Sequence, residues 1–374
     1  MRLIPIECVK EEESYLARSL YDNEGRILLK EGCKLTKSLL KKIKDLKVYS
    51  LYIIDEYSDK EINDVISPEL RQKSVKLIKD VFENAEMINL ANVEFNSLNN
   101  KETLSGLKQK EDYLNTLKDL SEDICQNILS NKDISVSLVD IKNMDAYTYQ
   151  HSVNVATLSV VMGIGIALPK EKLIDLCVGA LLHDIGKVFV GKSIIQKPAS
   201  LTDTELDVIK LHPKMGYDYM KNIPNLKTAC KMVVLQHHER VDGTGYPNAL
   251  VGEDINLLAR IVSIADVYDA LSSDRPYKRA MCPNDAFEFI LSKAGTMFDF
   301  NLTKLFSRII VPYPEGTIVN LSNNTTAVVK KTHPLYPLRP NVKVIKSDDE
   351  TLMNSIIDLS ESLAIVIQSI EYAI

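Results

Sequence analysis

Residues 173–187 read LIDLCVGALLHDIGK, and this stretch decides how the rest of the chain is interpreted. The apolar run predicts a buried helix, and His183 and Asp184 follow at its end, before a break at Gly186. A neighbouring imidazole and carboxylate offer nitrogen and oxygen ligands to a metal ion, with the cation Lys187 about one turn further on. Residues elsewhere that could complete a metal site are therefore the strongest candidates for function.

The composition is that of an ordinary globular protein, with 374 residues of which 45% are hydrophobic. The formal net charge of −6 argues against a nucleic acid polymer as partner, because proteins that bind one usually carry a broad basic surface. The six cysteines are far apart in the chain, so they predict neither a zinc ribbon nor a disulfide framework.

The N-terminal residues lack the charged start, apolar core and small-residue cleavage site of a signal peptide, which indicates a cytoplasmic protein. The most apolar window, residues 153–168, contains polar residues. It is also shorter than the roughly 18 to 20 residues that span a bilayer. Membrane insertion is therefore not expected.

Four segments are predicted from changes in the pattern along the chain. Residues 1–65 form a small α+β module, and residues 66–139 form a helical linker that packs on the core or on a dimer partner. Residues 140–308 are strongly helical and carry most of the chemically notable side chains. Residues 309–374 form a β-rich C-terminal segment. The expected fold class is mainly α.

Within the N-terminal module, residues 2–9 and 48–54 favour strands, and residues 22–25 signal a turn. Residues 36–46 interleave lysines with leucines at helical spacing. The lysine-rich stretch 34–47 is expected to be a solvated helix face rather than a ligand or partner surface. In the linker, apolar residues recur every three or four positions and predict one buried stripe. The stripe consists of Leu114, Leu117, Leu120, Ile124, Ile128 and Leu129.

The C-terminal segment contains short β-branched runs separated by Pro, Gly and Asn turns, which predict strands. The runs are residues 309–313, 316–321, 325–330 and 341–345.

Five of the six histidines lie within 88 residues of the helical segment. Each is near a predicted helix end, where both members of a pair such as His237 and His238 can reach one cavity. Asp266 lies within an apolar helix, where an unpaired carboxylate would be costly. Five histidines and two aspartates exceed the ligands of one structural zinc ion, but two metal ions sharing a carboxylate would use them all. The histidines are His151, His183, His212, His237 and His238.

The order and spacing of these residues resemble the HD-GYP phosphodiesterases, a branch of the HD metallohydrolase superfamily, over about residues 140–308. The histidine-aspartate pair alone would be weak evidence, whereas the order, the spacing and the glycine loop together are specific. The matching motifs are His151, His183-Asp184 with Lys187, His212, His237-His238-Glu239-Arg240, Asp242-Gly243-Thr244-Gly245-Tyr246-Pro247, Asp266 and Asp274-Arg275-Pro276-Tyr277-Lys278.

This resemblance implies a helical HD-domain bundle around a two-iron or iron/manganese centre. It also implies hydrolysis of cyclic di-GMP to pGpG, and in many members on to GMP, within bacterial second-messenger signalling. Two cations would lower the pKa of a bridging water, so that a metal-bridging hydroxide exists near pH 7 and attacks the phosphate. Lys187 would add positive charge at that phosphate.

Carried over residue by residue, the resemblance divides the metal ligands into two sets with Asp184 as the bridge. The sets are His151, His183, Asp184 and Asp266 for one metal, and Asp184, His212, His237 and His238 for the other. Some members have a glutamate one helical turn before the first histidine, where it helps to hold a third metal. Tyr147 stands there in this chain, which favours two metals.

The resemblance also assigns substrate contacts and partners. Lys187 would face the scissile phosphate, and Arg275 and Lys278 would hold the substrate's phosphates or guanine edges. Tyr246 lies in the Gly245-Tyr246-Pro247 loop, which is similar to one that lines the site and in some members meets a diguanylate cyclase. A second copy of the chain, which would form a homodimer through the linker, is the other expected partner.

Two residues outside the ligand sets have weaker assignments. Asp269 is either a hydrogen-bond acceptor for a ligating histidine or an ordinary helix cap or surface partner. Glu239 either orients His237 or His238 or pairs with Arg240. Two alternative functions stay open beside hydrolysis of cyclic di-GMP. One is an HD hydrolase of another cyclic or linear nucleotide, and the other is a non-catalytic cyclic di-GMP sensor.

Overall fold

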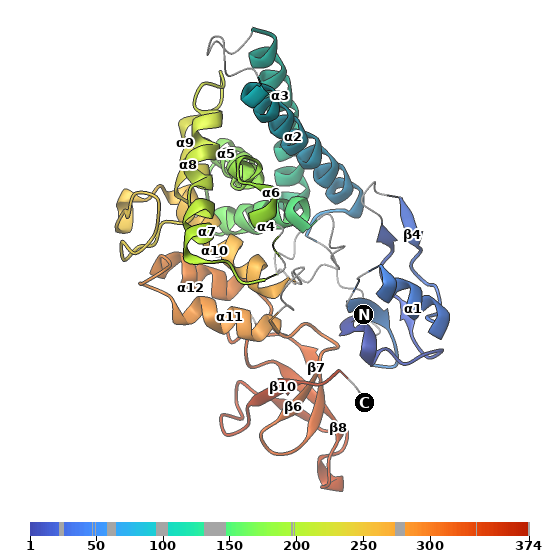
Figure 1. Cartoon of the computed structure of the whole chain (residues 1–374). Helices are drawn as coiled ribbons and strands as arrows, with labels where there is room; N and C mark the ends of the chain where they lie inside the picture. Colours follow the sequence, from blue (N-terminus) through green and yellow to red (C-terminus); the bar gives the residue numbers. More distant parts are fainter. Residues whose placement is uncertain are drawn as a thin grey trace.

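The helix predicted from residues 173–182 is α5 (Lys170–Leu182), and it lies inside a bundle of helices (Figure 1). The computed structural model describes residues 1–21, 26–46, 48, 50–57, 65–94, 104–130, 147–195, 197, 199–273, 281–333 and 335–372, without the side chains of 88–94, 104–110 and 147. The predicted mainly α fold class is confirmed, since helices make up most of the described chain.

The bundle packs around α5, which contacts α3, α4 and α9, while α10 lies against α4 and α9. Helices α4, α5 and α10 are apolar on nearly all sides, and a helix of that composition is buried in the middle of a domain. The helices are α2 (Pro68–Glu94), α3 (Leu104–Ser130), α4 (Tyr147–Gly165), α6 (Lys192–Ile195), α7 (Asp203–Ile209), α8 (His212–Met220), α9 (Thr228–Gln236), α10 (Leu257–Ser272), α11 (Pro283–Ser292) and α12 (Phe300–Ile309), with the short 3-10 helices η3 (Ile185–Phe189) and η4 (Gly252–Asp254).

The N-terminal module has a three-stranded antiparallel sheet of order β1-β5-β2 and a separate β3-β4 hairpin. Helix α1 (Lys37–Asp45) begins after Thr36, whose hydroxyl accepts a hydrogen bond from the amide of Leu39, and its lysines are exposed as predicted. The predicted turn at residues 22–25 lies outside the described residues. The other elements are β1 (Arg2–Pro5), η1 (Ile6–Cys8), β2 (Tyr15–Leu16), β3 (Leu20–Tyr21), β4 (Ile27–Leu29) and β5 (Ser50–Ile54).

The predicted strand at residues 2–9 is shorter than expected, because it gives way to a 3-10 turn after Pro5. Pro5 also lacks the amide hydrogen that would continue a sheet ladder beyond it.

The C-terminal segment forms a five-stranded antiparallel sheet of order β10-β6-β7-β8-β9, which lies beneath α11 and α12 in Figure 1. The predicted strand at residues 309–313 is wrong. Ile309 ends the amphipathic helix α12, which Asp299 caps by accepting a hydrogen bond from the amide of Leu302. The strands are β6 (Ile318–Leu321), β7 (Thr326–Lys331), β8 (Asn341–Lys346), β9 (Ile356–Asp358) and β10 (Ile367–Ile370), with η5 (Glu350–Leu352) between β8 and β9.

The helices α2 and α3 share one hydrophobic core with the rest of the bundle. The predicted stripe on α3 is buried against this core except for Leu129, which is 51% exposed. The stripe therefore packs on the chain itself, although the predicted division into four segments stays a prediction. None of the helices that the structure describes is both long and apolar enough to cross a bilayer.

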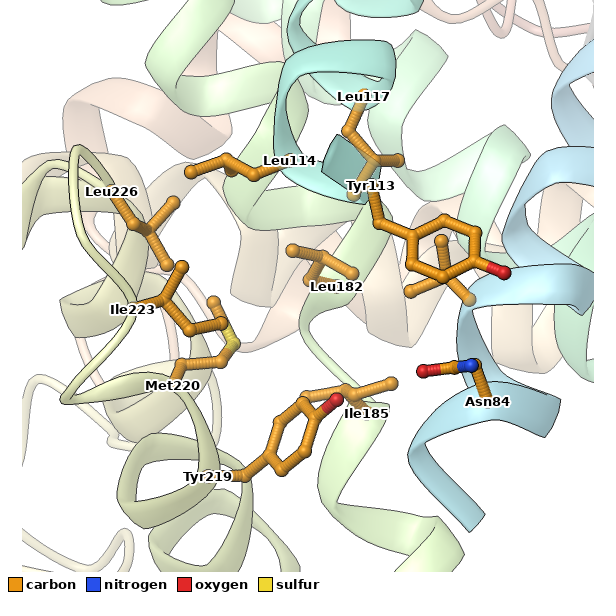
Figure 2. A pocket seen from close by; sticks show the side chains of 11 residues that line it. Asn84, Tyr113, Leu114, Leu117, Leu182, Ile185, Tyr219, Met220, Ile223 and Leu226 are labelled. Atoms are coloured by element: carbon orange, nitrogen blue, oxygen red, sulfur yellow. The ribbon is translucent and has the colours of Figure 1, made fainter. Parts of the chain in front are cut away.

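A small cavity of about 30 Å³ lies in the seam between α2, α3 and the bundle (Figure 2). Leu182 and Ile185 border it, and these residues directly precede and follow the His183-Asp184 pair. The seam is thus incompletely filled next to the candidate metal ligands. The lining residues are Val81, Asn84, Tyr113, Leu114, Leu117, Leu182, Ile185, Tyr219, Met220, Ile223 and Leu226.

We expect Leu117→Ala to lower the free energy of unfolding by about 2 to 5 kcal/mol, because it enlarges this cavity and removes buried apolar contacts. Leu117 is 2% exposed. The matched control is Leu129→Ala on the exposed side of the same helix, which should change stability by no more than about 0.5 kcal/mol. Urea denaturation of both variants gives the comparison, and equal losses would contradict the assignment of the buried face.

Candidate metal centre

Helix ends bring the candidate ligands together. His183 caps the C-terminus of α5, His237 caps that of α9, and His212 is the first residue of α8. His151 comes from the first two turns of α4, and Asp266 from the middle of α10. All five side chains are nearly or fully buried. They come from five separate helices, which converge on one point in the interior.

Gly186 allows two of these helices to approach closely. A side-chain Cβ on Gly186 would lie 1.9 Å from the carbonyl oxygen of His212 and 2.7 Å from the amide nitrogen of Gly216. No residue with a side chain fits there. The glycine after the histidine-aspartate pair therefore lets η3 lie against α8, which carries His212 toward Asp184.

The two carboxylate oxygens of Asp184 face different histidines. Oδ2 is 3.4 Å from Nε2 of His183 and 3.9 Å from Nε2 of His151. Oδ1 is 3.3 Å from Nε2 of His212 and 3.9 Å from Nε2 of His237. One carboxylate thus lies between two groups of imidazoles, which is the arrangement of a bridging ligand.

Two groups of donor atoms emerge, and within each group the atoms lie within 4.8 Å of one another. Asp266 belongs to the first, with its Oδ1 at 3.0 Å from Nε2 of His151. The groups are His151, His183 and Asp266, and Asp184, His212, His237 and His238.

The Nδ1 atoms of the buried histidines are all engaged outside the cluster. His183 and His212 have Nδ1 at 2.7 Å from the carbonyl oxygens of Ala180 and Ile209, and His237 has it at 2.9 Å from that of Val234. A carbonyl only accepts, so each Nδ1 carries the hydrogen. Nε2 is then the free lone pair, and in each ring it points into the cluster.

Nε2 of His212 and Nε2 of His237 lie 3.2 Å apart. If both nitrogens present lone pairs, they repel one another unless a cation lies between or beside them. Among the described residues, Nε2 of His183 and Oδ1 of Asp184 are buried without a hydrogen-bond partner. Buried polar atoms are rarely left unpaired. These atoms therefore fit a metal ion, and a mixture of imidazole and carboxylate suits a divalent transition metal.

Burial and neighbouring charges shift the pKa values of several groups in the cluster. Burial would raise the pKa of Asp184, but Lys187 and His183 outweigh burial and hold that pKa well below its usual range. Burial holds the pKa of His237 well below its usual range and lowers that of His238 to about 3. The pKa of His183 moves the other way, because burial would lower it but neighbouring carboxylates, chiefly that of Asp184, outweigh burial and raise it. Asp184, His237 and His238 are therefore held in the forms that bind metals.

A cleft of about 350 Å³ opens over the cluster. Lys187, in η3, lies at its side with its Nζ 2.5 Å from Oδ2 of Asp184, and its side chain is 32% exposed. A cleft of this volume is large enough for part of a small-molecule ligand. It is lined by Thr148, His151, Asp184, Lys187, Ile209, His212, His238, Tyr246, Asp266, Val267, Ala270 and Leu271.

The loop around Tyr246 forms one wall of the cleft. The ring of Tyr246 stacks on that of His238, with centroids 4.8 Å apart, and its amide donates to the carbonyl of His238. A Cβ on Gly245 would lie 2.3 Å from the amide nitrogen of Arg240, so a residue without a side chain is required there. The loop is thereby held directly against the residues that follow the histidine pair.

Glu239 secures this loop rather than orienting a histidine or pairing with Arg240. Its side chain is buried, and its two carboxylate oxygens accept hydrogen bonds from the amides of Asn248 and Leu250, at 2.7 and 3.0 Å. Sequence spacing alone could not find this role, because the partners are backbone groups nine and eleven residues away. Both hydrogen bonds tie down the segment that follows Tyr246.

For Asp269 the structure supports the first of the two predicted roles, since its Oδ2 lies 2.7 Å from Nδ1 of His151. Arg275 and Lys278 lie outside the described residues, and of Tyr147 only the backbone in α4 is described. The sequence also missed Thr148 as a lining residue and Asn154 as a partner of Asp269. Both are small polar residues in an apolar helix, and in the sequence this pattern is only a weak indication of a functional role.

Comparison with protein families gives two matches. The HD domain model matches residues 108–302, and a KOW domain associated with the HD domain matches residues 318–371. The first match covers more than half of the chain and contains every candidate ligand.

Curated relatives match parts of the chain. The chain is 38% identical to cyclic di-GMP phosphodiesterase PA4108 of Pseudomonas aeruginosa over 61% of this chain and 55% of that protein. It is 33% identical to cyclic di-GMP phosphodiesterase PdeB of Borreliella burgdorferi, over 56% and 57%. It is 36% identical to 3'3'-cGAMP-specific phosphodiesterase 3 of Vibrio cholerae, over 43% and 35%. The chain spans about half the length of the first two relatives.

We expect Glu239→Gln to loosen the loop without emptying the cluster, because the amide would present an NH₂ group to one of the two backbone amides. Hydrogen exchange at Asn248 and Leu250 should accelerate about tenfold or more, as for the loss of a hydrogen bond to a buried charged group. Exposed Glu253, in η4, gives the matched control Glu253→Gln. Unchanged exchange at both amides would show that Glu239 does not hold the loop.

Proposed function

This chain belongs to the HD domain family, and we propose that its histidine-aspartate centre hydrolyses the phosphodiester bonds of a cyclic dinucleotide, with cyclic di-GMP as the preferred substrate. Hydrolysis adds water across one phosphodiester and opens the ring to pGpG, and a second hydrolysis of the same kind would give GMP. The names of the cyclic di-GMP phosphodiesterases that the chain resembles support this substrate.

The position of Asp184 is the observation that carries the proposal. Its two oxygens face two histidine groups at the floor of the cleft. We assign one divalent metal to the group with His151 and the other to the group with His212, with Asp184 shared between them. The proposed sets are the two groups of clustered donors with Asp184 shared by both, that is His151, His183, Asp184 and Asp266, and Asp184, His212, His237 and His238.

When bound, two such metals would activate a water molecule as nucleophile and neutralise charge on the phosphoryl oxygens. Residues of the chain supply the rest. Lys187 stands beside Asp184 at the edge of the cleft, where its ammonium group can pair with a non-bridging oxygen of the scissile phosphate. Asp184 and Lys187 are therefore the proposed catalytic residues.

Tyr246 is the proposed substrate contact among the described residues, because its ring forms a wall of the cleft beside His238. Burial raises the pKa of its hydroxyl, so the phenol stays protonated and can donate a hydrogen bond. Arg275 and Lys278, on sequence grounds, would bind the phosphates or guanine edges.

The metal identity proposed here is iron, with manganese as the second choice, and two ions rather than three because Tyr147 replaces the glutamate of trinuclear relatives. The Gly245-Tyr246-Pro247 loop is the proposed contact for a diguanylate cyclase, and a homodimer is the second proposed assembly. The similarity to a 3'3'-cGAMP-specific enzyme makes cyclic GMP-AMP the second candidate substrate.

We expect the full chain, loaded with Fe²⁺ or Mn²⁺, to hydrolyse cyclic di-GMP faster than 3'3'-cGAMP or pGpG. Asp184→Asn should abolish turnover and most metal binding, because an amide cannot replace a shared carboxylate. Asp254→Asn, at an exposed position in η4, is the matched control. Chromatography of the products measures all three reactions. Faster cleavage of 3'3'-cGAMP would reassign the substrate, and binding without cleavage of any of them would favour the sensor.

For Lys187→Met we expect the metals to be retained while kcat falls about a hundredfold to a thousandfold, as when a charge-stabilising donor is removed from an active site. Lys192→Met, at an exposed lysine beyond η3 that pairs with Glu86, serves as the control. Metal content and steady-state kinetics of both variants are compared. Wild-type kcat in Lys187→Met would remove this lysine from the mechanism.

A further inference from the structure

Arg71, in the first turn of α2, is joined to the candidate metal centre by a continuous series of hydrogen bonds. Its Nη1 donates to Oδ1 of Asn154 at 2.6 Å, and Nδ2 of Asn154 donates to Oδ1 of Asp269 at 3.0 Å. Oδ2 of Asp269 lies 2.7 Å from Nδ1 of His151. The series passes from α2 through α4 to α10 and returns to a metal-ligand candidate on α4.

The geometry leaves the middle of this series little freedom. Asn154 is 2% exposed and Asp269 is 3% exposed, so bulk water has little access to replace their partners. Oδ1 of Asp269 also accepts a hydrogen bond from the Ser273 hydroxyl at 3.3 Å. A carboxylate only accepts, so the NH₂ group of Asn154 faces Asp269 and its amide oxygen faces Arg71. The guanidinium then supplies a charged donor to that oxygen, and charge-assisted bonds are the stronger kind.

The group that accepts the hydrogen bond from the Nδ1 of a histidine determines which ring nitrogen can bind a metal and how the ring is oriented. Asp269 takes the hydrogen on Nδ1 of His151, which leaves Nε2 as the lone pair directed at the cluster, 3.0 Å from Oδ1 of Asp266. It also fixes the rotation of the ring. Loss of such an acceptor typically weakens metal binding about tenfold to a hundredfold.

The other buried histidines are held differently. His183, His212 and His237 donate from Nδ1 to backbone carbonyls within their own helical turns or the turn just before. Those carbonyls move with the histidines they hold. His151, by contrast, takes its orientation from Asp269 on another helix. Asp269 is held by Ser273 and, through Asn154, by Arg71 on a third helix.

We propose that Arg71 is a positioning residue for one of the two metals, the one assigned to His151, His183 and Asp266, and that it acts through Asn154 and Asp269. This inference rests on the metal centre proposed above. The second metal has no such connection to α2 through the described hydrogen bonds. A displacement of α2 relative to α4 would therefore lower the binding affinity for one metal and leave the affinity for the other unchanged.

A purely structural role for Arg71 makes a different prediction. Arg71 would then stabilise the contact between α2 and α4, and its removal would lower thermal stability while affecting both metals alike or neither. An effect of Arg71 on the affinity for only one of the two metals thus distinguishes a positioning role from a purely structural one.

The test is a calorimetric titration of the chelator-treated full chain with Mn²⁺, together with the unfolding temperature of each metal-free variant. The wild-type chain should show two binding events. Asp269→Asn identifies the event that depends on His151, because it acts directly on that ring and should weaken one event about tenfold to a hundredfold. Arg71→Met should weaken the same event about tenfold and leave the other within about twofold.

Two further variants sharpen the result. Arg71→Lys keeps a cationic donor and should recover part of the lost affinity. Lys73→Met is the matched control, since Lys73 is exposed on the same helix and pairs with Asp123, and it should leave both events unchanged. Its unfolding temperature also shows what the loss of one α2 cation does by itself.

Four outcomes would contradict the proposal or the metal centre on which it rests. Equal weakening of both events in Arg71→Met would indicate structural support only, as would unchanged affinities with a lower unfolding temperature. If Arg71→Met weakened the binding event that Asp269→Asn leaves unchanged, Arg71 would position the other metal, and the assignment would be wrong. A wild-type chain that binds no manganese or iron would contradict the proposed metal centre itself, which distinguishes that failure from a failure of the Arg71 assignment.

Discussion

The burial of the Asp184 carboxylate between two groups of imidazoles is the constraint on which the rest of the structure depends. A carboxylate taken out of water is unfavourable unless positive charge or donors surround it. Here Lys187 supplies one charge at Oδ2, while Oδ1 has no hydrogen-bond partner among the described residues. The convergence of five helices at this point is therefore best understood as a frame for a cationic centre.

The frame is built largely from helix ends. Carbonyls near a helix C-terminus can accept further hydrogen bonds, and the rings of His183 and His237 each use one of them to fix Nδ1. The same geometry points Nε2 away from the helix and into the cluster. Close packing of η3 on α8, which only glycine at position 186 permits, brings the two halves of the centre together. Backbone structure thus performs the orientation that separate acceptor side chains would otherwise provide.

The outer parts of the molecule contact this centre at separate places. The loop with Tyr246 covers His238 and is held by the carboxylate of Glu239, so the wall of the cleft is tied to the helix end that carries the ligands. The helices α2 and α3 share the core of the bundle and reach the residues on either side of His183-Asp184. Single side chains therefore connect the packing of the outer helices and of the loop to the positions of the candidate metal ligands.

The sequence by itself determined the mainly α class, the buried helix ending at His183, and the seven ligand candidates, because periodicity and ligand chemistry are local properties of the chain. It misplaced the strand at 309–313, because Ile309 ends helix α12 and the next strand, β6, begins only at Ile318. Only the tertiary structure decided that Glu239 holds the loop and that Arg71 and Asn154 stand behind His151. These partners are brought together by the packing of α2, α4 and α10, and residues 83 and 115 positions apart leave no spacing that predicts such contacts.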